Sequence, residues 1–153
     1  MARPVRKPAR PAAQGQLRII GGEWRSRRLS FPEAPGLRPT TDRVRETLLN
    51  WLAPHVERAR VLDPFAGSGA LLLEALSRGA ARGLALELNP AAAAALRDNL
   101  ALLRAGNAEV RLGDALQQLQ GATAEPFDLV VCQGVLPYLS PPDLQQALHN
   151  LAG

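Results

Sequence analysis

A glycine-rich turn between a short apolar run and a helix is the part of this sequence best suited to hold a small ligand. The segment from Val61 to Leu71 reads VLDPFAGSGAL, so that Asp63 ends the apolar run and Gly67 and Gly69 follow in the turn. Glycine lacks a Cβ atom and lets backbone N–H groups approach a ligand, and the start of the next helix favours negative charge. The turn lacks the third glycine of a dinucleotide site and the Lys-Ser/Thr pair of a nucleoside triphosphate loop. It therefore predicts a site for a cofactor of another class.

Two further acidic residues follow later apolar runs. Glu87 closes the run at residues 83–88 and lies twenty-four positions after Asp63. In a doubly wound sheet, an acidic residue about twenty positions past the glycine turn binds ribose hydroxyls, because both strand ends border one crevice. Asp114 follows the next apolar run and could accept a hydrogen bond from an adenine amino group. An Asp after a Gly is also typical of turns and helix N-caps, so a structural role for Asp114 stays open.

The pattern Asp-Pro-Phe-x-Gly-x-Gly at residues 63–69 resembles motif I of the class I S-adenosylmethionine (SAM) methyltransferases. An ordinary joint between a strand and a helix, with glycines needed only for packing, would show similar letters. The acidic Glu87 at the expected distance favours a cofactor site over that alternative. The resemblance implies an α/β, Rossmann-like sheet of parallel strands with helices on both faces.

Composition describes one domain that can form a core. The chain has 153 residues, 46% of them hydrophobic. It contains neither an apolar run of about eighteen residues nor a stretch resembling a signal peptide, so no membrane contact is expected. The lone Cys132 forms no disulfide framework and suggests a reducing compartment, from which we expect a cytoplasmic protein. His55 and His149 lack ligand-spaced Cys or carboxylate neighbours, so we expect no metal, and we expect a monomer.

Positive charge is concentrated at the N-terminus. Residues 1–45 hold eleven Lys and Arg against three Asp and Glu, whereas the remainder holds seven against eleven. An arginine-rich segment beside a more acidic domain is typical of proteins that bind the phosphate backbone of nucleic acids. For residues 1–16, where prolines alternate with basic residues, a disordered basic tail is the alternative.

The segment after this tail predicts a hairpin and a helix. Residues 17–22 and 24–29 read as two short strands around a Gly-Gly turn, followed by a loop to about residue 40. Arg25, Arg27 and Arg28 make this hairpin basic. In the helix that follows, the spacing predicts a face packed on the sheet, formed by Val44, Leu48, Trp51 and Leu52.

Residues 41–153 predict the partial Rossmann-like core of a methyltransferase domain that begins at residue 17. Strands and helices alternate along this part, which is typical of a parallel sheet. The expected strands span residues 60–64, 83–88, 108–112 and 127–132, and the expected helices span residues 70–78, 90–103, 115–120 and 141–151.

Several segments taken together closely resemble the bacterial 16S ribosomal RNA guanine-N2 methyltransferase family, over roughly residues 17–115. The segment from Gly36 to Leu48, which contains RPTTDRVRE, is far more specific than motif I alone. The other segments are Arg18 to Gly22, Trp24-Arg25 and Asp63 to Gly69. Membership would imply transfer of the SAM methyl group to the exocyclic amine of a guanine, with 16S ribosomal RNA or a small-subunit assembly intermediate as the partner.

The resemblance also implies roles for individual residues. Thr40, Thr41 and Arg43 would border the entrance for the cofactor and the target base, although Arg43 and Arg45 could equally be surface charges of a helix. Glu87 would bind the ribose of SAM. The methionine end would be held by Asp63, Phe65, Gly67 and Gly69, and the adenine by Asp114 and Ala115.

The fourth strand departs from the family. The family has Asp-Pro-Pro-Phe/Tyr there, to accept hydrogen bonds from the amine and to stack on the extruded base, whereas residues 133–136 read Gln-Gly-Val-Leu. Gln133 could still accept a hydrogen bond. Ser140, in the sequence Ser-Pro-Pro-Asp, is a displaced substitute, although these letters also describe a helix start.

The segment at residues 127–139 looks instead like the fourth strand of small-molecule SAM methyltransferases. The chain also ends after about four strands, whereas the class I fold has seven. We therefore expect a sheet that is incomplete at the C-terminus, from a truncated, frameshifted or recombined reading frame. The leading hypothesis is a ribosomal RNA methyltransferase with an impaired acceptor site. The alternatives are a small-molecule methyltransferase and a non-catalytic RNA-binding remnant.

Overall fold

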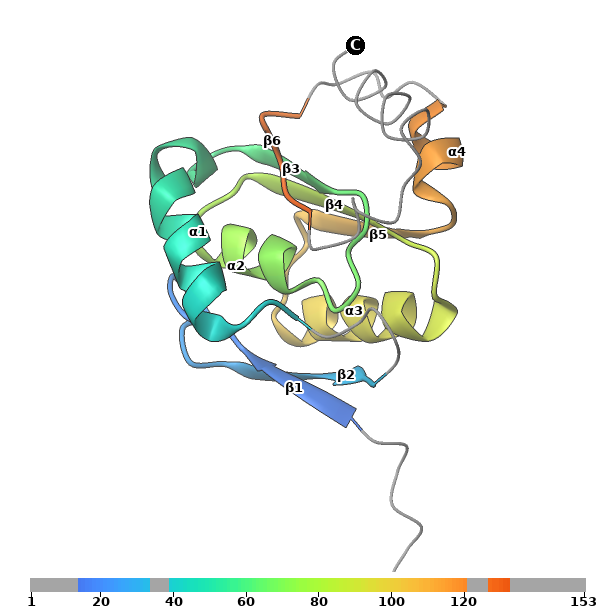
Figure 1. Cartoon of the computed structure of the whole chain (residues 1–153), viewed down its shortest axis with the longest axis horizontal. Coiled ribbons are helices and arrows are strands. Elements are labelled where there is room, and N and C mark those ends of the chain that lie inside the picture. Colours follow the sequence, from blue (N-terminus) through green and yellow to red (C-terminus); the bar gives the residue numbers. More distant parts are fainter. Residues whose placement is uncertain (1–13, 34–38, 121–126, 133–153) are drawn as a thin grey trace, which may run out of the picture.

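The computed structural model describes residues 14–33, 39–120 and 127–132 (Figure 1). Residues 1–13 of the expected tail, the helix at 141–151, and the candidate residues Gln133 and Ser140 lie outside this part of the chain. Residues 14–16, which were also expected to belong to the tail, are part of a strand.

Within the described residues, the central sheet has four parallel strands in the order β5-β4-β3-β6. The strands are β3 (Arg60–Asp63), β4 (Arg82–Glu87), β5 (Ala108–Leu112) and β6 (Leu129–Val130). The chain adds β4 and β5 on one side of β3 and then crosses to the other side for β6. This reversal is a topological switch point, where the carboxyl ends of neighbouring strands open a crevice. The predicted parallel sheet is confirmed.

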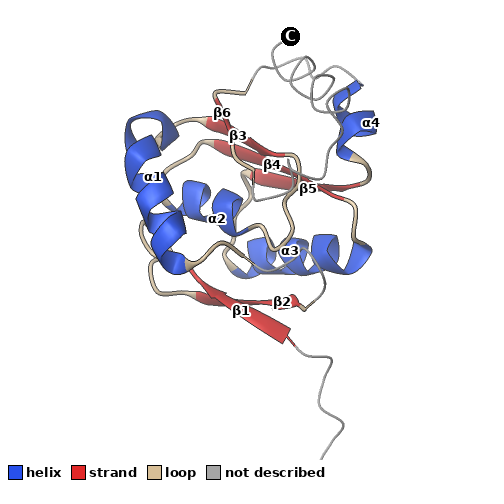
Figure 2. Cartoon of the chain, viewed as in Figure 1, coloured by secondary structure: helices blue, strands red, loops and turns tan. Residues whose placement is uncertain are grey.

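Four helices accompany the sheet in the described part of the chain (Figure 2). Apolar residues alternate between the two faces of the strands. Val61 and Ala85 belong to the larger core under α2 and α3, whereas Leu62, Leu84 and Ala115 form a smaller cluster on the opposite face. Both faces are therefore covered, as predicted. The helices are α1 (Asp42–Val56), α2 (Ala70–Ser77), α3 (Pro90–Leu102) and α4 (Ala115–Gln120).

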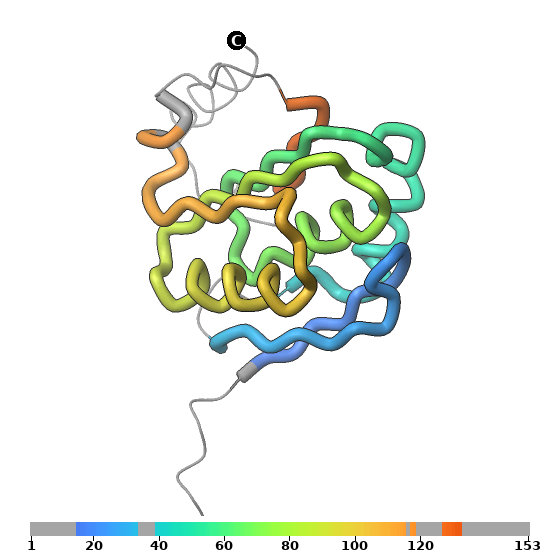
Figure 3. Tube along the Cα trace, turned by 180° about the vertical axis from the view of Figure 1, so that it is seen from behind, coloured from blue at the N-terminus to red at the C-terminus, as the bar shows by residue number. Residues whose placement is uncertain are grey.

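An antiparallel hairpin, β1 (Gln14–Arg18) with β2 (Arg28–Pro32), packs beneath the helices, as Figures 1 and 3 show from opposite sides. Burial alternates along the strands: Leu17 and Leu29 are buried, whereas their neighbours Arg18 and Arg28 are exposed. The Asn99 side chain on α3 donates a 2.9 Å hydrogen bond to the Ser30 carbonyl. The predicted hairpin exists, but its strands begin and end several residues away from the predicted bounds.

The connection between β1 and β2 is a docking loop and not the predicted two-residue turn. The Glu23 N–H donates to the Ser77 carbonyl at 2.8 Å, and the Ser77 hydroxyl donates to the Gly21 carbonyl at 2.6 Å. A Cβ atom on Gly22 would lie 2.0 Å from the Ser77 carbonyl oxygen, and Gly22 has a φ of +83°. The two glycines are therefore needed for close contact with the end of α2, which places the strands further apart in sequence.

Helix α1 buries only part of the face that was predicted. Val44 and Trp51 are 54% and 76% exposed, while Leu49 and Val56 are fully buried and Leu48 and Leu52 pack on the core. The buried face is shifted because it includes Arg45, which at 0% exposure is as buried as Leu49 one turn later. Apolar periodicity alone missed this orientation because a buried arginine is rare unless it is paired.

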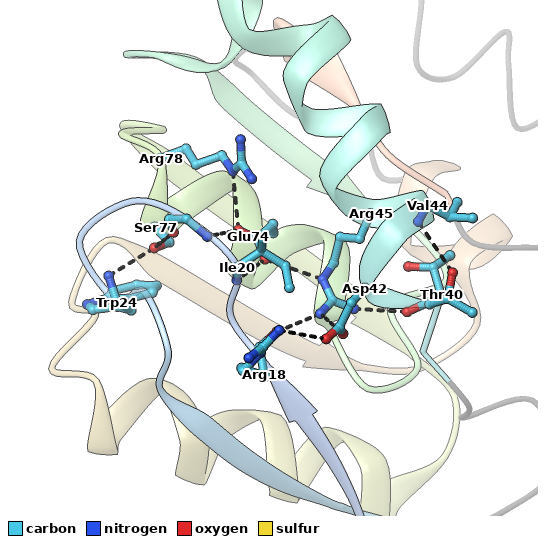
Figure 4. Close-up of polar contacts among 12 residues, drawn as sticks. Arg18, Ile20, Trp24, Thr40, Asp42, Val44, Arg45, Glu74, Ser77 and Arg78 are labelled. Carbon is cyan, nitrogen blue, oxygen red and sulfur yellow. Dashed lines mark hydrogen bonds and ion pairs between the residues drawn. The ribbon is translucent and has the colours of Figure 1, made fainter.

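Arg45 is paired with Glu74 of α2, as Figure 4 shows. Its Nε donates to Glu74 Oε1 at 3.3 Å, and its other nitrogens donate to the carbonyls of Thr40 and Arg18 and to Asp42. Glu74 also accepts hydrogen bonds from the backbone N–H groups of the hairpin residues Ile20 and Gly21 and from Arg78. One buried ion pair therefore connects the hairpin, α1 and α2.

Replacement of Arg45 by Ala should strongly destabilise the fold. Glu74 would remain a buried carboxylate without its main counter-ion, which costs about 3–5 kcal/mol in comparable cases. Urea unfolding should show this loss in the free energy of unfolding, whereas Arg43→Ala, an exposed neighbour, should change it by less than about 0.5 kcal/mol.

The double variant Arg45→Met/Glu74→Gln separates the ion pair from simple loss of packing. Since neither residue would then be charged, it should lose less stability than the two single variants together. Additive losses, or a loss below about 1 kcal/mol for Arg45→Ala, would contradict the assigned role of the pair.

Candidate active site

The glycine-rich turn joins β3 to α2 at the carboxyl edge of the sheet. Gly69 has a φ of +79°, and a Cβ atom there would lie 2.5 Å from Leu96 of α3. The Ala66 N–H donates to the Leu86 carbonyl of β4 at 3.1 Å. The turn is thus fastened to the neighbouring strand, and only glycine fits at position 69.

Glu87 ties the end of β4 to this turn. One carboxylate oxygen accepts a 2.5 Å hydrogen bond from the Gly67 N–H, and the other accepts a 3.0 Å bond from the Asn89 N–H. Each carboxylate oxygen can accept more than one hydrogen bond, so capacity is left for a ligand hydroxyl. The structure therefore brings Glu87 and the glycine turn together, as their positions at neighbouring strand ends predict.

Asp63 lies behind the turn and is only 1% exposed. Its carboxylate accepts a 3.3 Å hydrogen bond from the Phe65 N–H. Burial raises the pKa of Asp63 to about 7; the Phe65 N–H opposes this shift, and the nearby negative charge of Glu87 adds to it. With a pKa of about 7, Asp63 would change its charge near neutral pH.

Ser68, between the two glycines, carries an unused polar group. Its side-chain oxygen is buried and has no hydrogen-bond partner among the described residues. Buried hydroxyls in native proteins are nearly always paired. With the glycine turn and two carboxylates beside it, this oxygen fits a site that is completed by a polar ligand.

The end of β5 lies at the same edge. The Gly113 N–H donates to the Glu87 carbonyl at 2.9 Å, which places Asp114 next to the end of β4. Asp114 is exposed and Ala115 is buried. The Asp114 carbonyl also accepts from the Gln118 N–H at 3.0 Å, so that this residue starts α4 as well. Both interpretations of Asp114, at the edge and at a helix start, are compatible with this geometry.

Two apolar residues at this edge were not singled out from the sequence. Leu88 and Leu112 are 70% and 45% exposed, although each ends an apolar strand run. Exposed leucines that flank polar groups offer a surface for a flat apolar ring. Their position in the sequence, directly after Glu87 and directly before Gly113, could have indicated that they lie at this edge.

The residues predicted at the entrance lie at the start of α1. The Thr41 hydroxyl accepts a hydrogen bond from the Val44 N–H at 3.3 Å and is therefore the N-cap of this helix. The Thr40 carbonyl accepts from Arg45, its hydroxyl oxygen is buried without a described partner, and Arg43 is exposed. Arg45 is not a surface charge. The role of the other three at an entrance stays a prediction.

The arginines predicted to contact RNA are exposed. Arg25 and Arg27 lie in the docking loop, and Arg28 starts β2 opposite Arg18 of β1. Because Leu17, Leu29 and the other inward residues face the core, the outer face of the hairpin is basic.

None of the described helices is long and apolar enough to cross a membrane. In the described part of the chain, no three His, Cys, Asp or Glu side chains gather in a way that could hold a metal ion.

Comparison with known proteins gives consistent relatives. The family model described as conserved hypothetical protein 95 matches residues 17–152, well past residue 115, where the family resemblance was expected to end. The chain is 58% identical over 108 residues to ribosomal RNA small subunit methyltransferase D of Escherichia coli (strain K12), covering 71% of this chain and 54% of that protein. The chain thus spans about half the length of this relative.

A second relative and two solved structures extend the likeness. Ribosomal RNA small subunit methyltransferase D of Haemophilus influenzae is 43% identical over 141 residues, covering 90% of this chain and 69% of that protein. The solved structure of the methyltransferase yhhF from Escherichia coli aligns with a TM-score of 0.77 at 49% identity, covering 90% of this chain and 73% of that chain. A hypothetical protein from Thermus thermophilus aligns with a TM-score of 0.76 at 31% identity, covering 88% of this chain and 78% of that chain.

Replacement of Asp63 by Asn should change how stability depends on pH. The folded-state pKa of about 7 lies above the usual value of 3.8, so the folded protein binds this proton more tightly than the unfolded chain does. The contribution of Asp63 to stability therefore falls as pH rises from about 4 to about 7 and is constant above. Since Asn carries no charge, the stability of Asp63→Asn relative to the unmodified chain should rise across this window, by up to a few kcal/mol.

Urea unfolding at several pH values measures this difference, with Asp98→Asn, an exposed position on α3, as the control. A stability difference for Asp63→Asn that does not vary with pH would show that Asp63 keeps an ordinary pKa in the folded protein.

Proposed function

Because this chain belongs to the conserved hypothetical protein 95 family, that of the bacterial 16S ribosomal RNA guanine-N2 methyltransferases, we propose that it binds SAM and methylates the exocyclic amine of a guanine in 16S ribosomal RNA. The fold is that of a class I SAM-dependent methyltransferase. The hydrogen bond between Glu87 and the Gly67 N–H carries the proposal. It joins the acidic strand end and the glycine turn at the switch point, where this class of fold binds its cofactor.

The residues at this edge fit the parts of SAM. Asp63, Phe65 and the glycine turn would hold the methionine end, where an ionised Asp63 would pair with the ammonium group. Glu87 would accept from the ribose hydroxyls. Asp114 and Ala115 would border the adenine, whose flat ring could pack on the exposed Leu88 and Leu112.

SAM supplies an electrophilic methyl group on its sulfonium. In the proposed reaction the guanine N2 would form a bond to this methyl carbon as the carbon–sulfur bond breaks, S-adenosylhomocysteine would leave, and a proton of the amine would pass to a nearby acceptor or to water. The chain has to hold the amine in line with the methyl group, which is an effect of orientation worth several kcal/mol. We propose that residues after β6 hold the amine, with Gln133 or Ser140 as the candidates.

Binding of RNA would use the basic face of the hairpin. Arg25, Arg27 and Arg28, with Arg18 beside them, are exposed and can each pair with a phosphate. The partner would be 16S ribosomal RNA or a small-subunit assembly intermediate. The chain would act as a monomer in the cytoplasm.

Replacement of Glu87 by Ala should weaken SAM binding. The ribose would lose hydrogen bonds to a charged acceptor, each worth about 1.5–3 kcal/mol, so affinity should fall by roughly tenfold or more. Calorimetry with SAM measures this change, and Glu57→Ala, an exposed glutamate at the C-cap of α1, is the matched control. Equal affinity in the Glu87→Ala variant and the unmodified chain would remove the ribose role.

Transfer of a radiolabelled methyl group to small-subunit RNA or to assembly particles tests the activity. Because residues 133–136 read Gln-Gly-Val-Leu, we expect turnover far below the usual enzyme rate of about 10 per second, even at saturating SAM. Restoring Asp-Pro-Pro-Phe at these positions should raise it. Turnover at a usual rate in the unmodified chain would show that other residues position the amine.

The same measurements separate the alternatives. A small-molecule methyltransferase would bind SAM without salt-dependent affinity for RNA. An RNA-binding remnant would show that salt dependence and no methyl transfer, even with the tetrad restored.

A further inference from the structure

A hollow of about 650 Å³ lies between the hairpin and the start of α1. Its lining comes from β1, from β2 and the residue after it, and from the segment that leads into α1, and it includes none of the strand ends that form the candidate active site. The lining residues that bear on its chemistry are Gln16, Phe31, Glu33, Pro39, Thr40 and Asp42. A second hollow of about 290 Å³ shares Gln16 and Asp42 with the first and is also lined by Arg18 and Arg28.

The wall of the larger hollow is held by the buried guanidinium of Arg45. One of its terminal nitrogens donates to the Thr40 carbonyl at 2.9 Å, and the other donates to Asp42 at 2.9 Å and to the Arg18 carbonyl at 2.6 Å. The side chain of Arg45 is 1% exposed. The hollow is therefore formed before any ligand enters, which lowers the entropy cost of binding.

The two carboxylates of the hollow, Asp42 and Glu33, differ in how many of their oxygens are free to accept a hydrogen bond from a ligand. Both oxygens of Asp42 are used, one by Arg45 and one by Arg18. Glu33 is exposed and makes no hydrogen bond or ion pair with any residue of the described structure. It is therefore the acceptor that a ligand could use, and a ligand with two neighbouring N–H donors could replace water on both of its oxygens.

Around Glu33, the lining suits a flat polar ring. The partly exposed Pro39 offers apolar surface, Phe31 adds little because it is only 6% exposed, and the exposed Gln16 offers one donor group and one acceptor. The Thr40 hydroxyl oxygen is buried without a partner in the described part of the chain. The carboxylates disfavour a phosphate in the larger hollow, while Arg18 and Arg28 favour one in the smaller hollow beside it.

We propose that the larger hollow binds one unpaired guanine of the RNA substrate, separate from the methyl-transfer site, with its neighbouring phosphate on Arg18 and Arg28. Guanine alone among the RNA bases presents two adjacent donors, N1–H and the N2 amine, on its Watson–Crick edge, and Glu33 accepts both. Adenine and cytosine present an acceptor beside their amine, and uracil flanks its single N–H with carbonyls. This inference rests on the proposed function, since it takes RNA as the substrate.

The test uses the full chain and short uridine-rich oligoribonucleotides with a single central guanine, adenine or inosine. Fluorescence anisotropy should show about tenfold tighter binding of the guanine oligomer than of the adenine oligomer. Inosine, which keeps N1–H and lacks the N2 amine, should bind with intermediate affinity.

Glu33→Gln should clearly reduce the preference for guanine, because an amide presents only one acceptor oxygen and places an NH2 group against the second donor. Glu23→Gln, an exposed glutamate in the same hairpin that does not line the hollow, should retain the preference. Equal binding of guanine and adenine oligomers by the unmodified chain would overturn the inference. A preference that is undiminished in Glu33→Gln would also overturn it, since the base would then be read elsewhere.

Calorimetry with SAM distinguishes a failure of this inference from a failure of the proposed function. Both glutamate variants should bind SAM as the unmodified chain does. A chain that binds SAM and RNA without preferring guanine overturns this inference alone. A chain that binds neither overturns the proposed function together with it.

Discussion

The buried ion pair between Arg45 and Glu74 is the interaction on which the arrangement of the helices and the hairpin depends. Both side chains are almost fully excluded from water, at 1% and 0% exposure. Removing two charges from water costs several kcal/mol per ion, which is offset only when every donor and acceptor is satisfied. Here the partners are backbone groups of the hairpin, the segment before α1, and side chains of α1 and α2. The pair therefore specifies one arrangement of these elements, because any shift would leave a buried charge unpaired.

This constraint connects the two surfaces that the proposed function needs. Helix α2 begins directly after the glycine turn, and Glu74 lies five residues after Gly69, about 7.5 Å along the helix. The other end of α2 holds the docking loop of the hairpin through Ser77. The basic face and the cofactor turn are thus attached to the same short helix, which is buried along its whole length. The hairpin is consequently an integral part of the fold, although in sequence it precedes the sheet.

The sequence was sufficient for the strands and for the acidic residues at their ends, and insufficient for the packing of α1. Runs such as residues 83–88 predict buried strands because burial on both faces requires apolar residues throughout. Asp63, Glu87 and Asp114 then share an edge because parallel strands align their carboxyl ends. Arg45, in contrast, is buried because of Glu74, twenty-nine positions further along. No local pattern reports such a partner, so apolar spacing selected Val44 and Trp51 for the core, and both are exposed.

The candidate site has two parts, and only the first could be predicted from the order of the strands. All the predicted cofactor residues lie between Asp63 and Ala115, on elements whose order alone brings them together, and their geometry could be anticipated from topology. The residues proposed to hold the guanine amine follow β6 and lie outside the described part of the chain. The geometry of the described residues therefore supports the cofactor site more directly than it supports turnover. Methyl transfer depends on orientation at the acceptor, and the bond between Glu87 and Gly67 contributes nothing to that orientation.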